Sequence, residues 1–323
     1  MKIALLILYN HRYDQNIPRI EKLYEGKFSH IFHIMPFYDG NLPNVIPVYE
    51  SSYYFQSYIA QAYQQIKKMG FTHYFIVADD MIINPTINEN NLFEVTGIPK
   101  DYCYIHNLRN ITGHKTPPWA FKFYAYEYNP NQKGLEIINI LPSFDEAKHT
   151  LENQGFRSRN LSFLEFVHDC FWALTHRRRK IFFQTIRSGF LHRKPKYPLI
   201  GGWSDILLLN NNIMSSFCKY CGAFAASNLF AEIAIPTSLL LCSTQIVTAQ
   251  DIALKNNIHL IYSLPHKAQD EFYQQNNYNL DKLLANYPKD RFFIHPIRLT
   301  SFMPNIRSLS WVSTSDRLKL RDF

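Results

Sequence analysis

Glycine and charged residues are scarce in this sequence. It holds 11 glycines among 323 residues, and 19% of its residues are charged against 46% that are hydrophobic. The low glycine content excludes collagen-like and glycine-rich low-complexity chains, and the hydrophobic content excludes an intrinsically disordered one. Tyrosine (21) and phenylalanine (25) are abundant instead, which indicates aromatic-lined surfaces as well as a core. The length suits one large α/β domain or two smaller ones.

Cysteines and long apolar runs are also few. The five cysteines are an odd number, which argues against a disulfide framework and for a reducing compartment. Cys218 and Cys221 form a lone CxxC pair with no second pair at zinc-finger spacing, so we expect them to pack in a core. Ile3–Tyr9 is too short for a signal peptide, and Ile233–Cys242, interrupted by Pro236, is too short to cross a bilayer. These features predict a cytoplasmic protein.

Acidic residues are absent from one stretch, residues 176–196, which we call the basic segment. It carries eight lysines and arginines, and the rest of the chain balances 26 basic against 26 acidic residues, so the net charge of +8 is a local feature. Phenylalanine, isoleucine and leucine interleave with these charges, as in segments that lie on an anionic membrane surface. A solvated loop or a lid over a diphosphate are the alternatives. We expect no nucleic-acid partner, because the excess charge is confined to one place.

The first part of the chain alternates between strand and helix patterns. The apolar runs predict strands, and apolar residues at helical spacing predict the helices between them. The order along the chain is Ile3–Tyr9, Ile17–Leu23, Ser29–Met35, Val45–Tyr49, Tyr53–Met69 and Thr72–Ala78. Such alternation implies parallel crossovers. We therefore predict an α/β fold with a Rossmann-like, mixed but mostly parallel sheet flanked by helices, and with a helical basic insertion.

Later elements are less regular. We predict strands at Tyr102–His106, Glu136–Leu141, Leu199–Leu209, Ile258–Tyr262 and Phe292–His295. We predict helices at Leu161–Leu174, at Ser227–Leu241 with a kink at Pro236, and in pieces over Gln269–Ala285.

The strongest local signal for chemistry is a buried strand pattern that ends in Asp79 and Asp80. Ligands of open α/β sheets bind outside the carboxyl ends of the strands, where these carboxylates would lie. Two neighbouring acids can hold a divalent cation whose other ligands are water and substrate phosphates. The alternative is an acid that caps the next helix or is solvated in a turn.

A second signal is the run Gly201, Gly202, Trp203, Ser204 and Asp205. Paired glycines let the backbone approach a ligand, and the indole offers a stacking surface. The same residues would also suit a bulge that enters a strand.

A third signal is Glu232, near the start of the helix that follows Ser227 and Asn228. An acid on an otherwise apolar face is costly without a partner or a function, and partial burial would raise its pKa toward the range of a general base. A first-turn acid favoured by the helix dipole is the alternative.

Together these segments resemble nucleotide-sugar-dependent glycosyltransferases of the GT-A fold, especially the bacterial enzymes that build surface polysaccharides. The resemblance covers the order of elements over most of the chain and rests on short motifs: the strand ending in Tyr9 and Asn10, the strand ending in Asp79 and Asp80, and the two segments around 201–205 and 228–232. It implies that Tyr9, Asn10 and Arg12 line the nucleotide site, with Asp79, Gly201, Gly202 and Trp203 also on the donor side.

The resemblance further implies that Asp80 and His295 hold Mn²⁺ or Mg²⁺ against the diphosphate. Asp205 or Glu232 would face the acceptor hydroxyl as the base. The two acids 79 and 80 are adjacent, whereas the family motif separates them by one residue, so the need for a metal stays open.

By the same resemblance the whole chain, 1–323, is one GT-A-like catalytic domain. Its parts would be a nucleotide-binding half (about 1–110), a helical and basic insertion (about 155–198), an acceptor-side half (about 199–300) and a basic tail (301–323). The implied reaction moves a sugar from a nucleotide-sugar to a saccharide or lipid-linked acceptor in lipopolysaccharide, O-antigen or capsule synthesis, at the inner face of the cytoplasmic membrane. The alternatives are a metal-dependent nucleotidyltransferase and a non-catalytic carbohydrate- or nucleic-acid-binding protein.

Overall fold

The structure is a computed structural model in which the following residues are described: 1–111, 124–125, 128–131, 136–175, 182–183, 186, 194–256, 266–297 and 299–301. The strand predicted at Ile258–Tyr262, most of the basic segment and nearly all of the tail 301–323 lie outside these residues.

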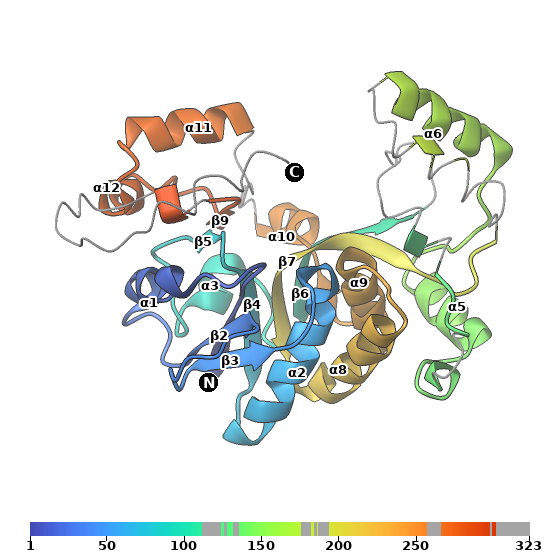
Figure 1. Ribbon diagram of the computed structural model, residues 1–323, viewed down its shortest axis with the longest axis horizontal. Coiled ribbons are helices and arrows are strands. Elements are labelled where there is room, and N and C mark those ends of the chain that lie inside the picture. Colours follow the sequence, from blue (N-terminus) through green and yellow to red (C-terminus); the bar gives the residue numbers. More distant parts are fainter. Residues whose placement is uncertain are drawn as a thin grey trace.

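A seven-stranded sheet runs through the centre of the described part of the chain (Figure 1). Its order is β3-β2-β1-β4-β7-β6-β8, and β7 is antiparallel to its two neighbours while the other pairs are parallel. The bounds are β1 Ile3–Leu8, β2 Ile31–Pro36, β3 Val45–Val48, β4 His73–Ala78, β6 Cys103–Asn110, β7 Ile200–Asn210 and β8 Ile246–Val247. The predicted mixed, mostly parallel α/β sheet is confirmed.

The central strands are apolar because both faces of the sheet are covered. Every residue of β1 and β4 is buried. Alternate side chains then enter different cores: Ile3, Leu5 and Ile7 pack on one face, and Ala4, Leu6 and Leu8 pack on the other. A continuous apolar run is therefore the pattern that a strand in this position needs.

Helices cover both faces of the sheet, as Figure 1 shows. Side chains from α1 (Ile17–Tyr24), α3 (Leu92–Thr96), α10 (Ala249–Asn256), α11 (His266–Gln275) and α12 (Leu280–Ala285) join the first core. The other core is filled by α2 (Phe55–Ile66), α8 (Asn211–Ala226) and α9 (Ala231–Cys242). Cys218 and Cys221 lie buried in this second core as free thiols, which confirms the packing role expected for them.

The predicted helix Ser227–Leu241 is wrong at its start. Asn228 has a left-handed backbone with φ of 61°, so α8 ends before it and α9 begins only at Ala231. Asparagine tolerates this conformation better than most residues, and the break separates the two helices. Pro236 then lies inside α9.

A smaller core joins α8 and α9 to the region between residues 111 and 199. This region contains α5 (Phe144–Asn153) and α6 (Phe163–Thr175), the latter at the predicted position. The strand predicted at Glu136–Leu141 is wrong: Ile137–Asn139 is a short 3₁₀ turn. Leu141 donates its backbone N–H to the Ile137 carbonyl, and both side chains enter the small core. Two core residues four positions apart lie on the same side of a helical turn, so a turn buries both of them.

A second, two-stranded sheet lies beside the main one. It pairs β5 (Ile82–Ile83) with β9 (Phe293–Ile294) in antiparallel register, so Ile82 lies opposite Ile294. Because β5 follows Asp80 after one residue and β9 precedes His295 directly, this pairing brings the two together across more than 200 residues of chain.

Candidate active site

The predicted site residues gather at the carboxyl ends of β1 and β4. The chain leaves β1 toward β2 on one side and returns in β4 on the other, so the strand order reverses between these two strands. Their register places Leu8 opposite Ala78, and thus Tyr9 and Asp79 continue side by side. Such a reversal point at the carboxyl edge is where open α/β sheets bind ligands.

Asp79 faces inward and holds the loop that follows β1. It is 4% exposed, and its carboxylate accepts hydrogen bonds from the Asn10 backbone N–H and the Asn16 side chain. Burial and the neighbouring Asp80 raise its pKa to about 7, against the lowering effect of these hydrogen bonds. Asp79 therefore fixes the position of residues 10–16 rather than facing solvent.

Asp80 faces His295. The distance from its Oδ1 to His295 Nε2 is 3.1 Å, and the two side chains are 33% and 14% exposed. The Asp80 carbonyl also accepts the Ile297 N–H at 2.7 Å, which ties down the chain beyond β9. Burial lowers the pKa of His295, but the hydrogen bond to Asp80 and the charges of Asp80, Asp205 and Asp79 outweigh burial, so the pKa is raised overall.

Asp205 approaches the same pair from β7. The antiparallel register places Ile206 opposite Val77, so Asp205 lies where β4 ends, and its Oδ2 is 4.0 Å from His295 Nε2. Burial raises its pKa to about 6, with His295 opposing and Asp80 adding to the shift. Trp203 packs its ring against the His295 ring at 5.1 Å and supports the imidazole from the side.

Glu232 adds a carboxyl group from the first turn of α9. Burial and the charge of Asp205 raise its pKa to about 8, while Arg109 and His295 lower it. A carboxyl group with a pKa in this range can accept a proton from a substrate near neutral pH. The charges of Asp205 and His295 both act on the pKa of Glu232, so the three groups are electrostatically coupled.

The two glycines before Trp203 have a packing role. A Cβ on Gly202 would lie 2.4 Å from the Asn107 carbonyl oxygen and 3.0 Å from Cγ of Pro236, so only glycine lets β6, β7 and α9 approach this closely. The β6–β7 register also shifts between Ile105 and Asn107. Gly201 is buried as well. The packing at Gly202 and the register shift in the neighbouring strand favour the alternative given above for this motif, a bulge that enters a strand.

The residues predicted to line the nucleotide site differ in their placement. Tyr9 is fully buried, and its hydroxyl forms a 2.8 Å hydrogen bond with His33 Nδ1. Its side chain therefore supports the site from inside and does not line it. Asn10 and Arg12 are exposed, and the Arg12 guanidinium pairs with Asp14 at 2.9 Å and Asp39 at 2.7 Å.

The sequence did not indicate Arg109 or His106. Arg109 is the penultimate residue of β6 and pairs in register with Gly201, and its charge lowers the pKa of Glu232. His106 is buried against Trp203 with ring centres 5.1 Å apart, and burial and Arg109 lower its pKa to about 4. Only the β6–β7 register, a long-range property, brings them to the site.

Asp80 and His295 form a hydrogen-bonded pair, and the same two atoms would be adjacent ligands of a divalent cation once His295 has lost its proton. Adjacent ligands of an octahedral ion, each about 2.1 Å from the metal, are about 3 Å apart, close to the 3.1 Å between these two atoms. Both side chains reach the surface in part. Within the described ranges no group of three or more His, Cys, Asp or Glu is arranged as a metal site, so phosphate and water would have to complete the coordination shell.

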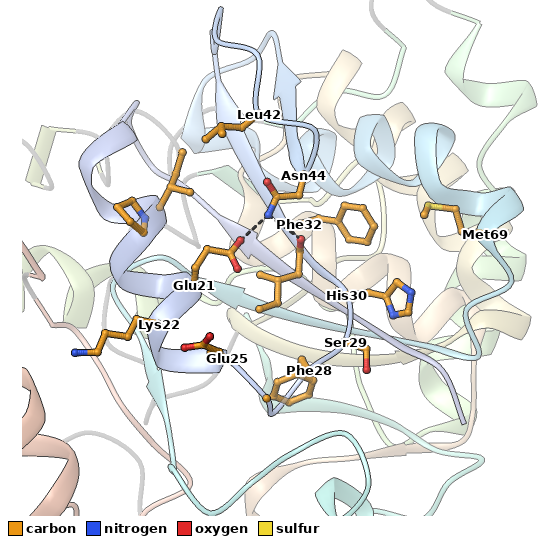
Figure 2. Close-up of a pocket in the computed structure, with 14 residues that line it drawn as sticks. Glu21, Lys22, Glu25, Phe28, Ser29, His30, Phe32, Leu42, Asn44 and Met69 are labelled. Atoms are coloured by element: carbon orange, nitrogen blue, oxygen red, sulfur yellow. Dashed lines mark hydrogen bonds between the residues drawn. The ribbon is translucent and has the colours of Figure 1, made fainter.

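A groove of about 1080 Å³ lies elsewhere, at the amino end of β2 (Figure 2). The Asn44 side chain donates a 2.5 Å hydrogen bond to the Glu21 carboxylate, and both residues line the groove. Figure 2 marks this bond with a dashed line. Glu21 also pairs with His33. None of the predicted site residues lines the groove. Because it opens at the opposite edge of the sheet from Asp80, we treat it as separate from the candidate site.

Comparison with known proteins does not identify this arrangement. The chain matches no protein-family model, and a search of curated proteins finds no match to it. The function must therefore be argued from the site itself.

Proposed function

We propose that the chain is a glycosyltransferase that moves a sugar from a nucleotide-sugar donor to a saccharide or lipid-linked acceptor in cell-surface polysaccharide synthesis. The observation that carries this proposal is that Asp80 and Asp205 both approach His295 beside the strand-order reversal, while the charges of Asp205 and His295 act on the pKa of Glu232. The resemblance to GT-A glycosyltransferases supports it, because the same residues were singled out by that resemblance.

In this proposal the acceptor oxygen forms a bond to the anomeric carbon of the donor, and the bond from that carbon to the diphosphate oxygen breaks. Glu232 accepts the hydroxyl proton, since its pKa of about 8 gives it the basicity for proton transfer. The nucleoside diphosphate leaves with the electron pair of the broken bond.

The leaving group needs its developing negative charge stabilised. Asp80 and His295 would hold a Mn²⁺ or Mg²⁺ ion there, and a bound cation supplies this stabilisation. Asp79 holds the Asn10 loop in place through its hydrogen bond, and this loop would line the nucleotide. Asp205 Oδ2, 4.0 Å from His295 Nε2, would help to position the imidazole, which gives up its proton when the cation binds.

We place the reaction in the cytoplasm, with the acceptor reached at the inner face of the membrane. Within the described ranges, no helix combines the length and the apolar character needed to cross a bilayer. A lipid-linked acceptor would still bring the enzyme to that surface, and the acid-free basic segment suits anionic headgroups.

The test is a thermal-shift screen of the full chain with UDP, GDP, CDP, CMP and ADP, each with Mn²⁺ and with a chelator. A ligand at about 100 times its Kd adds about 2.7 kcal/mol of stability. We expect one nucleoside diphosphate to raise the melting temperature, and chelation to remove most of the increase. The absence of any shift would contradict the proposal and favour a non-catalytic binding protein.

Two variants sharpen this screen. Asp80→Ala should fold normally and lose the Mn²⁺-dependent part of the shift. Asp270→Ala is the control, because this aspartate is exposed on α11 and is not one of the residues of the proposed site. Equal shifts in wild type and Asp80→Ala would remove Asp80 from the proposed cation site.

A further inference from the structure

Helix α6 presents its apolar side chains to solvent and its acidic ones to the protein. Five large apolar residues on its outer side are 46–70% exposed: Phe163, Leu164, Val167, Phe171 and Leu174. The buried positions are Glu165, Asp169 and Ala173. A surface helix of a soluble protein usually shows the reverse arrangement, with the apolar stripe toward the core.

The buried acids of α6 have partners close to them in the sequence. Glu165 is 1% exposed, and its two carboxylate oxygens accept hydrogen bonds from the Arg159 guanidinium, both at 2.8 Å. The Ser162 N–H donates to the same carboxylate at 3.0 Å. Arg159 and Ser162 belong to the segment that leads into α6, so this pairing satisfies the buried carboxylate where the helix begins.

Asp169 reinforces this arrangement one turn later. It is 2% exposed, and its Oδ1 lies 3.5 Å from His168 Nδ1. Since the acids point inward, the exposed positions of α6 are apolar, neutral or histidine and carry no acidic side chain. In Figure 1, α6 lies at the periphery of the molecule, away from the central sheet.

The charge of the adjoining chain indicates what covers this face. The basic segment begins directly after α6 and carries eight lysines and arginines without one acid. Phe183 and Ile186 within it are 67% and 38% exposed. An exposed apolar helix face followed by clustered positive charge is the combination that binds in the interfacial layer of an anionic bilayer.

We propose that α6 is a membrane-docking helix. The helix lies in the plane of an anionic membrane and inserts its exposed apolar side chains into the interfacial layer: Phe163, Leu164, Val167, Phe171 and Leu174. The positive charge that follows the helix in the sequence favours anionic headgroups. This surface is distinct from the cluster around Asp80. Vesicle binding needs neither nucleotide nor cation, so its failure and the failure of the glycosyltransferase proposal are distinguishable.

The test is flotation of the full chain with vesicles of phosphatidylcholine and phosphatidylglycerol, compared with vesicles of phosphatidylcholine alone. We expect binding to the anionic vesicles that weakens at high salt. Phe163→Ser/Phe171→Ser should lower the partition coefficient about tenfold for each ring removed from the bilayer. The control is Phe37→Ser/Tyr49→Ser, a pair 61% and 68% exposed on another part of the surface, which should bind like wild type.

A second variant does not remove apolar surface. Phe171→Trp should show an additional, blue-shifted indole emission when anionic vesicles are added. Absence of wild-type binding to anionic vesicles would overturn the proposal, as would equal binding by the Phe163/Phe171 variant. A concentration-dependent dimer that is lost in this variant, without vesicle binding, would assign the face to a second copy of the chain.

Discussion

Glu232 makes a distinctive prediction for the pH dependence of activity. Its pKa is raised to about 8, mainly by burial and then by Asp205. A base with this pKa is about one-tenth ionised at pH 7 and about nine-tenths ionised at pH 9. We therefore expect kcat/KM to rise about tenfold between these pH values, along a limb with an apparent pKa near 8.

Neighbouring substitutions should move this limb in opposite directions. Asp205→Asn removes a negative charge that raises the pKa of Glu232, so the limb should shift to lower pH. Arg109→Met removes a positive charge that lowers the same pKa, so the limb should shift to higher pH. Glu232→Gln should abolish the limb and lower kcat by about 10² to 10⁴, the range for loss of a general base.

Stability offers a check that needs no substrate. Because the folded state raises the pKa of Glu232 from 4.5 to about 8, the wild-type fold loses stability as the pH rises through this window. Glu232→Gln lacks this titrating group. The difference in melting temperature, variant minus wild type, should therefore increase as the pH rises from about 4.5 to about 8.

The assay is release of nucleoside diphosphate from a nucleotide-sugar, measured from pH 5 to 10 with wild type and the three variants. A limb near pH 6 that persists in Glu232→Gln and vanishes in Asp205→Asn would refute the assignment of Glu232 as base. A cation held by Asp80 and His295 should move the pKa of Asp205 below 6, which keeps the two limbs apart. A rate independent of pH would refute both assignments.

Three further predictions concern the fold and the cation. Gly202→Ala should destabilise the protein by about 1–3 kcal/mol in chemical denaturation, because its Cβ would meet the Asn107 carbonyl at 2.4 Å; unchanged stability would contradict the packing role. Tyr9→Phe should cost about 1–3 kcal/mol by leaving the buried Nδ1 of His33 without its hydroxyl partner, whereas a neutral effect would show that the bond contributes nothing. His295→Ala should weaken Mn²⁺ binding, measured by calorimetry with the nucleoside diphosphate present, and unaltered affinity would exclude His295 as a ligand.

Sequence patterns predicted the elements whose causes are local. The runs around β1 and β4 are apolar throughout because both sheet faces are covered, and this marked them as central strands. The acids after β4 then had to lie at the carboxyl edge. Gly70 ends the helical stretch before β4 with a left-handed φ of 72°, a conformation that glycine adopts readily.

The rest depends on pairings that no short window contains. Asp205 lies opposite the end of β4 only because β7 is antiparallel with Ile206 opposite Val77. His295 reaches Asp80 through the β5–β9 pairing. The sequence also could not separate the roles of adjacent Asp79 and Asp80, because one side chain faces the buried loop and the other faces His295.

The most direct test of the central proposal is product identity. The wild-type chain and the Asp80→Ala variant are incubated in parallel with Mn²⁺ and a nucleotide-sugar. The nucleotide-sugar is one that contains the nucleoside diphosphate found in the thermal-shift screen. We expect wild type to release nucleoside diphosphate and free or transferred sugar, and Asp80→Ala to release little. Release of pyrophosphate from a nucleoside triphosphate, with no nucleoside diphosphate from any nucleotide-sugar, would contradict sugar transfer and identify a nucleotidyltransferase.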